Sequence, residues 1–123
     1  MMKRKTEKNS MVEICPIRNV VARFGNKWSL LIVLVLSENG KTRFNQLNKL
    51  IPDISTKVLS GTLQTLEADG LVIRTVFPEV PIRVEYELSE TGLSLVPIIR
   101  NLTDWAMQNM KSIMKHREMY ESM

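Results

Sequence analysis

The stretch from Ser55 to Asp69 combines a helical pattern with side chains that can donate and accept hydrogen bonds. At about 100° per residue, small, polar or cationic residues fall on one arc of roughly 140°: Thr56, Lys57, Ser60, Gly61 and Gln64. Mainly apolar residues occupy the opposite arc: Val58, Leu59, Thr62, Leu63 and Leu66. A glutamine amide can bond both edge groups of adenine, and a lysine can bond guanine or a phosphate. Because no carboxylate appears on the polar arc before Glu67, the pattern indicates a helix able to lie in the DNA major groove.

Other residues add to this candidate surface. Ser55 and Thr56 stand at the expected start of the helix, and Gly61 offers no side chain, which would allow close approach of backbone and DNA. Arg43, at another expected helix start, is a candidate phosphate ligand. Arg83, with Arg74 as a further candidate, would contact phosphates or the minor groove. The alternative is an ordinary amphipathic helix with a solvated outer face.

Caps and periodicity predict the elements that position these residues. Proline suits the first position of a helix, so one helix is predicted from Pro16 to about Phe24, ended by Gly25. The next helices begin at side-chain caps and end at glycine or before proline. They are predicted at 27–38 after Asn26, at 43–50 after Thr42, and from Ser55 to Gly70.

The pattern then changes to that of strands. Residues 72–77 are rich in β-branched and aromatic types, and residues 84–88 alternate apolar with acidic, so a hairpin is predicted with Pro78 and Pro81 in its connection. Ser89 caps a last helix reaching about Lys115, which Pro97 is predicted to kink or effectively to start. The fold class is therefore α+β, mainly α: a winged helix-turn-helix with a two-stranded hairpin as the wing.

Length and composition restrict the number of domains and the classes of function that the chain can have. The chain of 123 residues fits one domain over 13–123, after a basic tail over 1–12 that we expect to be disordered. The formal charge of +4 favours polyanionic partners. We expect no membrane span and no secretory signal, hence a cytoplasmic protein. With Cys15 and His116 as the single cysteine and histidine, a His/Cys metal cluster within one chain is excluded. No enzyme motif and no cofactor site is evident.

The last predicted helix carries more apolar surface than one small domain needs to cover. Its stripe includes Leu95, Ile98, Leu102 and Trp105. Pairing with a second copy would bury this stripe, and a symmetric dimer would match a palindromic operator. We expect the N- and C-terminal helices to form that dimer. The competing hypothesis is a winged helix used only for protein contacts, whose signature would be an apolar outer face on the 55–69 helix.

An ordered series of motifs gives a family resemblance. It runs through Cys15-Pro16-Ile17, Gly25-x-Lys27-Trp28, Arg43-Phe44-x-x-Leu47, Ile54-Ser55-x-Lys57-x-Leu59, Leu63-x-x-Leu66-Glu67-x-Asp69-Gly70-Leu71 and Pro78-x-x-Pro81-x-x-Val84-Glu85-Tyr86. From about Cys15 to Trp105 the chain resembles the HxlR-type winged-helix regulators. The resemblance implies a bacterial or archaeal homodimeric transcription factor, close in fold to the MarR group, that binds double-stranded DNA. Gly61 departs from the longer polar or basic residue common in the family, and Asn45 departs without an obvious consequence.

Cys15 is a candidate redox residue. Its place before a helix start favours the thiolate, and in part of the family the matching cysteine senses oxidants or electrophiles. Because the chain has no second cysteine, a Cys15–Cys15 bridge, a mixed disulfide with a small thiol, or alkylation remain. The alternative is a small buried packing residue. A small-molecule or electrophile effector is compatible with the sequence, which does not identify the operator or distinguish repressor from activator.

Overall fold

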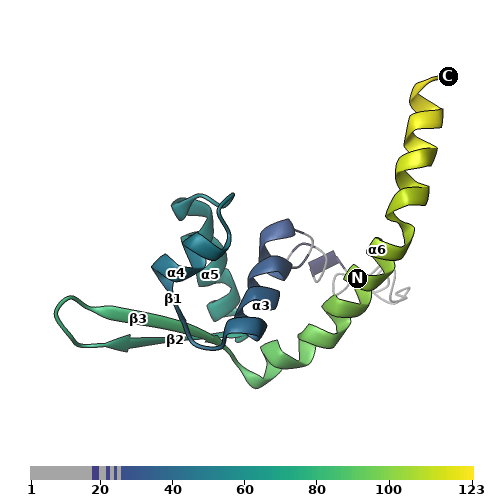
Figure 1. Cartoon of the computed structure of the whole chain (residues 1–123). Coiled ribbons are helices and arrows are strands. Elements are labelled where there is room, and N and C mark those ends of the chain that lie inside the picture. The colour runs from purple at the N-terminus through teal and green to yellow at the C-terminus, as the bar shows by residue number, and fades with distance from the viewer. Residues whose placement is uncertain (1–17, 20–21, 23, 25) are drawn as a thin grey trace, which may run out of the picture.

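The computed structural model describes residues 18–19, 22, 24 and 26–123 (Figure 1). Its elements follow the order α3 (Lys27–Asn39), β1 (Thr42–Arg43), α4 (Phe44–Leu50), α5 (Thr56–Ala68), β2 (Val72–Phe77), β3 (Arg83–Leu88) and α6 (Glu90–Glu121). The tail over 1–12, Cys15 and most of the helix predicted from Pro16 to Phe24 lie outside the described residues. The α+β class and the winged helix-turn-helix architecture are confirmed.

Three predicted side-chain caps begin helices in the structure. The side-chain oxygen of Asn26 accepts the backbone N–H groups of Trp28 at 2.9 Å and Ser29 at 3.0 Å, which starts α3. Ser55 accepts from the backbone N–H of Val58 at 3.1 Å, and Ser89 does the same for Gly92 at 3.0 Å. Each bond satisfies an N–H that lacks a partner within its helix. The glycines predicted to end α3 and α5, Gly40 and Gly70, have φ values of 68° and 79°.

The sheet differs from the predicted two-stranded hairpin because a short third strand joins it. The prediction that Thr42 caps α4 is wrong: Thr42 lies in β1, is 1% exposed, and donates its hydroxyl to the carbonyl of Gly40 at 2.8 Å. Arg43 precedes α4 without a side-chain capping bond. β1 pairs antiparallel with β3, Thr42 opposite Tyr86, and the strand order is β1-β3-β2.

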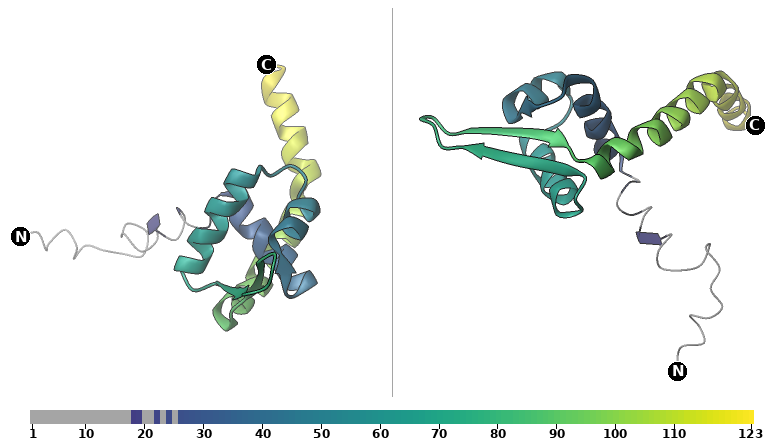
Figure 2. Two further views of the ribbon diagram at one scale, coloured as in Figure 1. Left: turned by 90° about the vertical axis from the view of Figure 1, so that its left-hand side faces the viewer. Right: turned by 90° about the horizontal axis from the view of Figure 1, so that it is seen from below.

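The wing is the hairpin of β2 and β3, as predicted. The strands pair antiparallel from Val72 opposite Leu88 to Phe77 opposite Arg83. Val72, Tyr86 and Leu88 bury the base of the hairpin in the core. Figures 1 and 2 show the distal part of the hairpin projecting beyond the helices, at the end of the molecule away from the C-terminus.

The core sets the rotation of α5 about its own axis. Leu59, Leu63 and Leu66 are at most 1% exposed and belong to one apolar cluster with side chains of α3, α4, the sheet and α6. The predicted apolar arc was too wide, because Val58 is 39% exposed and Thr62 is half-buried. Both lie on the flank of α5 rather than on the leucine face. The Thr62 hydroxyl donates to the carbonyl of Val58 at 2.7 Å.

Helix α6 is longer than predicted. It spans 32 residues, about 48 Å, and continues to Glu121 instead of ending near Lys115. Pro97 lies inside the helix, so it does not mark the start. Ile99 packs in the core and α6 contacts α3, whereas the C-terminal half stands clear of the other elements in Figures 1 and 2. Within the described part of the chain, every helix is too short or too polar to cross a bilayer.

Candidate nucleic-acid interface

The outer face of α5 carries the predicted polar residues in exposed positions. Lys57, Ser60, Gly61 and Gln64 are all exposed. The buried leucines lie on the opposite side of α5 and pack in the core, so this face points outward from the domain. The arrangement leaves an amide, an ammonium and a hydroxyl available to base edges or phosphates, with no acidic residue between Thr56 and Leu66.

Two hydroxyl groups that were predicted to belong to the site form hydrogen bonds at the N-terminal end of α5. Ser55 caps the helix, and Thr56 accepts a hydrogen bond at 3.2 Å from the side-chain amide of Asn48 in α4. The second bond joins the two helices of the helix-turn-helix. Each bond uses the hydroxyl oxygen as the acceptor, so the hydroxyl hydrogen can still be donated to a phosphate. Asn48 was missed because no local pattern in its helix signals a partner beyond the turn.

Gly61 has no packing reason to be glycine. A Cβ built on it meets no atom within 4 Å, and its φ is not in the left-handed region. Besides facing outward, it lines a hollow with Asn26 and Ser29 of the neighbouring helix start. The role predicted for Gly61, close approach of the backbone to DNA, therefore stays a prediction.

Arg43 lies between the helix-turn-helix and the wing. It is exposed at the start of α4, and its cross-strand neighbour in β3 is Glu85. With Pro81, Ile82 and Arg83 of the wing, it lines a second hollow. A basic side chain in this place can reach a backbone phosphate beside a groove occupied by α5.

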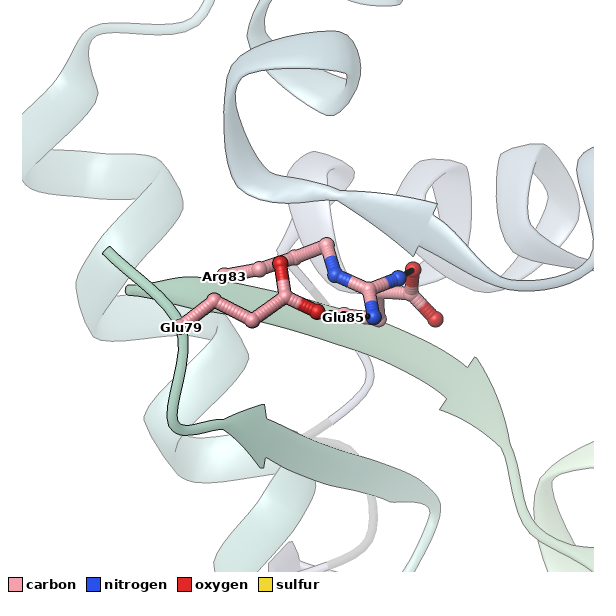
Figure 3. A network of polar contacts seen from close by, with 3 residues as sticks. All are labelled: Glu79, Arg83 and Glu85. Atoms are coloured by element: carbon pink, nitrogen blue, oxygen red, sulfur yellow. Dashed lines mark hydrogen bonds and ion pairs between the residues drawn. The ribbon is translucent and has the colours of Figure 1, made fainter. Parts of the chain in front are cut away.

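Arg83 is held by contacts within the wing (Figure 3). Its two terminal nitrogens donate to Glu79 at 2.8 Å and to Glu85 at 2.7 Å, and its guanidinium lies over the ring of Phe77. The hydrogen bond to Glu79, and the charges of both glutamates, raise the pKa of Arg83 above its ordinary value. The sequence prediction placed a free cation here, whereas the structure places a cation already neutralised by two carboxylates.

Glu79 and Glu85 were not predicted as part of the site. Glu85 was detectable, because residues two apart on a strand lie on the same face and Arg83 is two residues before it. Glu79 gave no such signal, since it lies in the connection that brings it back toward Arg83. Among the described residues, there is no cluster of three or more histidine, cysteine or acidic side chains able to hold a metal ion.

The fold and the outward polar face of α5 together define a winged helix-turn-helix protein. The family described as HxlR-like helix-turn-helix matches residues 23–114, and the chain belongs to this family. An uncharacterized HTH-type transcriptional regulator of Methanothermobacter thermautotrophicus is 44% identical over 92 residues, which cover 75% of this chain and 70% of the relative. YtfH of Escherichia coli, also an uncharacterized HTH-type regulator, is 36% identical over 112 residues, covering 91% and 88%.

Solved structures of similar proteins agree with this assignment. A transcriptional regulator YtfH from Salmonella typhimurium superposes with a TM-score of 0.76 at 34% identity, covering 89% of this chain and 97% of that protein. The redox regulator HypR in its reduced form gives 0.74 at 34% identity, covering 81% and 98%. Reduced YodB of Bacillus subtilis gives 0.67 at 36% identity, covering 77% and 93%. The chain is therefore a member of a family of transcriptional regulators and not an enzyme.

Proposed function

We propose that the chain is a sequence-specific DNA-binding regulator that binds a palindromic operator as a homodimer. The observation that carries the proposal is the outward face of α5, which is exposed, polar or cationic, and free of carboxylates from Thr56 to Leu66. Such a face can enter the negatively charged major groove without repulsion. A winged helix used only for protein contacts would expose an apolar face there. In α5 the exposed large apolar side chain is that of Val58, which lies on the flank of the helix and not on this outward face.

The proposed contacts divide by their chemistry. Gln64 reads a base edge, and Lys57 bonds either guanine or phosphate. Ser55, Thr56 and Ser60 donate hydroxyl hydrogens to bases or phosphates, while Gly61 allows the backbone to approach. Arg43 bonds a phosphate beside the groove. Arg83 acts on the same DNA backbone from the wing. It either exchanges a glutamate for a DNA phosphate as its hydrogen-bond partner, or it holds the wing tip in position.

The proposed dimer uses the apolar face of α6. Ile98, Leu102 and Trp105 are 63%, 54% and 56% exposed, and their spacing of four and three residues places them on one side of the helix. Leu95, predicted with them, is partly buried against the core. An exposed apolar stripe of this kind, on the side of α6 away from the core, supports pairing with the same helix of a second copy.

The proposed signal is oxidation or alkylation of Cys15, which lies outside the described residues. HypR is a redox regulator with reduced and oxidized structures, and YodB has reduced and diamide-treated structures. Their likeness to this chain supports a thiol response here. A small molecule that acts elsewhere on the dimer is the alternative effector.

Selection of bound duplexes from random DNA tests the proposed function. The wild-type protein should enrich a motif with two inverted half-sites, spaced by about one helical turn, because a symmetric dimer presents two α5 helices. The enriched duplex should bind at two chains per duplex in sedimentation. A pool that shows no enrichment, although the protein is folded by circular dichroism, would contradict DNA reading and favour protein contacts.

A further inference from the structure

The start of α6 is bonded to the turn that follows α5. The Ser89 hydroxyl donates to the carbonyl of Gly70 at 2.6 Å, and the Ser89 backbone N–H donates to the carbonyl of Leu71 at 3.0 Å. The N–H of Leu71 in turn donates to the carbonyl of Leu66 in α5 at 2.9 Å. These bonds join the end of α5 to the start of α6, although β2 and β3 separate the two helices in the sequence.

Gly92 lets the two segments lie closer than a residue with a side chain would allow. A Cβ built on Gly92 would overlap the carbonyl oxygen of Leu71, and it would lie 3.2 Å from Cδ2 of Leu88. Glycine in a helix costs about 1 kcal/mol relative to alanine, so helix stability does not account for this residue. The N–H of Gly92 also donates to the Ser89 hydroxyl at 3.0 Å. The joint between α5 and α6 therefore consists of Gly70, Leu71, Ser89 and Gly92.

This joint connects the helix proposed to pair with a second copy to the helix proposed to read DNA. Beyond the joint, α6 is held to the domain by apolar side chains that include Ile99, which is 2% exposed in the core. Arg100 adds an ion pair with Glu38 of α3 at 3.7 Å. From there α6 leads away from α5 and the wing (Figures 1 and 2). The angle between α6 and α5 therefore depends on the joint and on the packing around Ile99.

We infer that Ser89 and Gly92 are positioning residues for DNA recognition, because they fix the angle between α6 and α5 and thus the separation of the two α5 helices in the dimer. The inference rests on the proposed function. Gly92 and Ile99 lie about two turns, or about 10 Å, apart along α6. Displacing the first turn by about 1 Å would tilt α6 by about 5°, which moves the N-terminal end of α5, about 20 Å from the joint, by about 1.7 Å. Since both copies move, the separation would change by about 3.5 Å, one base-pair step.

Variants of Ser89 separate the joint from the helix cap. Ser89→Asp keeps an acceptor for the N–H of Gly92, because aspartate caps a helix as well as serine does, but the carboxylate has no hydrogen to donate to Gly70. Ser89→Thr keeps both functions. Gly92→Ala adds a Cβ to the joint. Ser94→Ala is the matched control, since it removes an exposed hydroxyl that donates within α6 and does not contact the joint.

Binding is measured on the duplex enriched in the selection described above, and on versions of it whose central spacer is one base pair longer or shorter. Wild type should lose about tenfold in affinity on the altered spacers, because only one half-site is then fully engaged. Ser89→Asp and Gly92→Ala should flatten this preference to less than about threefold or move its optimum to another spacer. Ser89→Thr and Ser94→Ala should keep the wild-type profile. Affinity for a single half-site should stay within about twofold in all four variants.

The dependence on spacer length distinguishes positioning from a purely structural role. A loss of affinity that is equal on all spacers would mean that the joint only stabilises the fold. That outcome, or a wild-type profile in Ser89→Asp, would overturn the inference and leave DNA binding intact; Ser89→Asp carries the test if Gly92→Ala does not fold. Wild type that enriches no motif, or that binds one half-site as tightly as the palindrome, would overturn the proposed function as well. Circular dichroism checks folding, and sedimentation checks the dimer.

Discussion

The guanidinium carbon of Arg83 lies 3.8 Å from the centre of the Phe77 ring, its partner across the two strands of the wing. The same guanidinium joins Glu79 of the connection to Glu85 of β3. The wing tip is therefore held by one cation that bonds two carboxylates and stacks on a ring. Arg83 can therefore have either of two roles: it binds a DNA phosphate, or it supports the wing.

Glu79→Gln distinguishes these roles. If Arg83 contacts phosphate, removing the carboxylate that competes for it should raise affinity for specific and nonspecific duplexes by a few fold. Arg83→Ala should lower both and reduce the salt slope by about 1. If Arg83 only supports the wing, Glu79→Gln should weaken binding, and Arg83→Ala should leave the slope unchanged. Fluorescence anisotropy over a salt series measures both quantities.

The outward face of α5 predicts different effects for Gln64 and Lys57. Gln64→Ala should cost about 1 to 3 kcal/mol on the enriched duplex and almost nothing on nonspecific DNA, because it removes a base contact. Lys57→Ala should weaken both duplexes if its ammonium bonds a phosphate. Gln108→Ala, in the exposed part of α6, is the control and should change neither affinity. Unchanged affinity in both α5 variants would remove this helix from the groove.

The rotation of α5 can be tested through stability. Leu63→Ala removes a side chain that is 1% exposed and should lower the free energy of unfolding by about 2 to 5 kcal/mol. Val58→Ala removes one that is 39% exposed and should cost less than about 1 kcal/mol. Urea denaturation of both variants gives the comparison. Equal losses would mean that Val58 is part of the core, and that the exposed face of α5 is turned away from the position described above.

Local signals explain why most elements were predictable from the sequence. Asn26, Ser55 and Ser89 each cap a helix through a bond to an N–H no more than three residues away. Such bonds depend on neighbouring residues alone. The β-branched and aromatic composition of residues 72–77 likewise predicted β2, and the alternation over residues 84–88 predicted β3. The outward face of α5 followed from periodicity, with an error only at its flank, where Val58 and Thr62 lie.

The features that the sequence did not predict depend on distant residues. β1 has two residues, too few for any periodicity, and it exists because Thr42 and Arg43 pair with Tyr86 and Glu85 of β3. The contact of Asn48 with Thr56 and the position of Glu79 beside Arg83 are also set by the turns between elements. The end of α6 was placed too early because residues 116–121 are mostly polar and do not continue the apolar stripe.

A charge on the exposed face of α6 tests the dimer. Leu102→Glu should release monomers at micromolar concentration, because the side chain is 54% exposed in one chain and would be buried against a second copy. Met107→Glu is the control: Met107 is 79% exposed on another side of the helix and should leave the dimer intact. Sedimentation velocity measures the state of each variant. Wild type that sediments as a monomer would contradict the proposed interface.

The last prediction concerns Cys15 and follows from the absence of any other thiol in the chain. If it is the sensor, treatment with diamide or a quinone should change affinity for the enriched duplex by more than tenfold. Cys15→Ser should abolish that response and leave reduced-state binding within about twofold.

The effect has to act through the geometry of the dimer, because the predicted helix that starts after Cys15 is not the helix proposed to enter the groove. Moving a regulator decisively between two states requires several kcal/mol of differential stability. A disulfide between the two copies can supply that more readily than a small adduct, because it constrains two chains at once. Non-reducing electrophoresis and intact mass distinguish a Cys15–Cys15 bridge, a mixed disulfide and alkylation. If fully modified protein, verified by mass, binds the duplex as the reduced protein does, Cys15 is a packing residue and the signal reaches the dimer by another route.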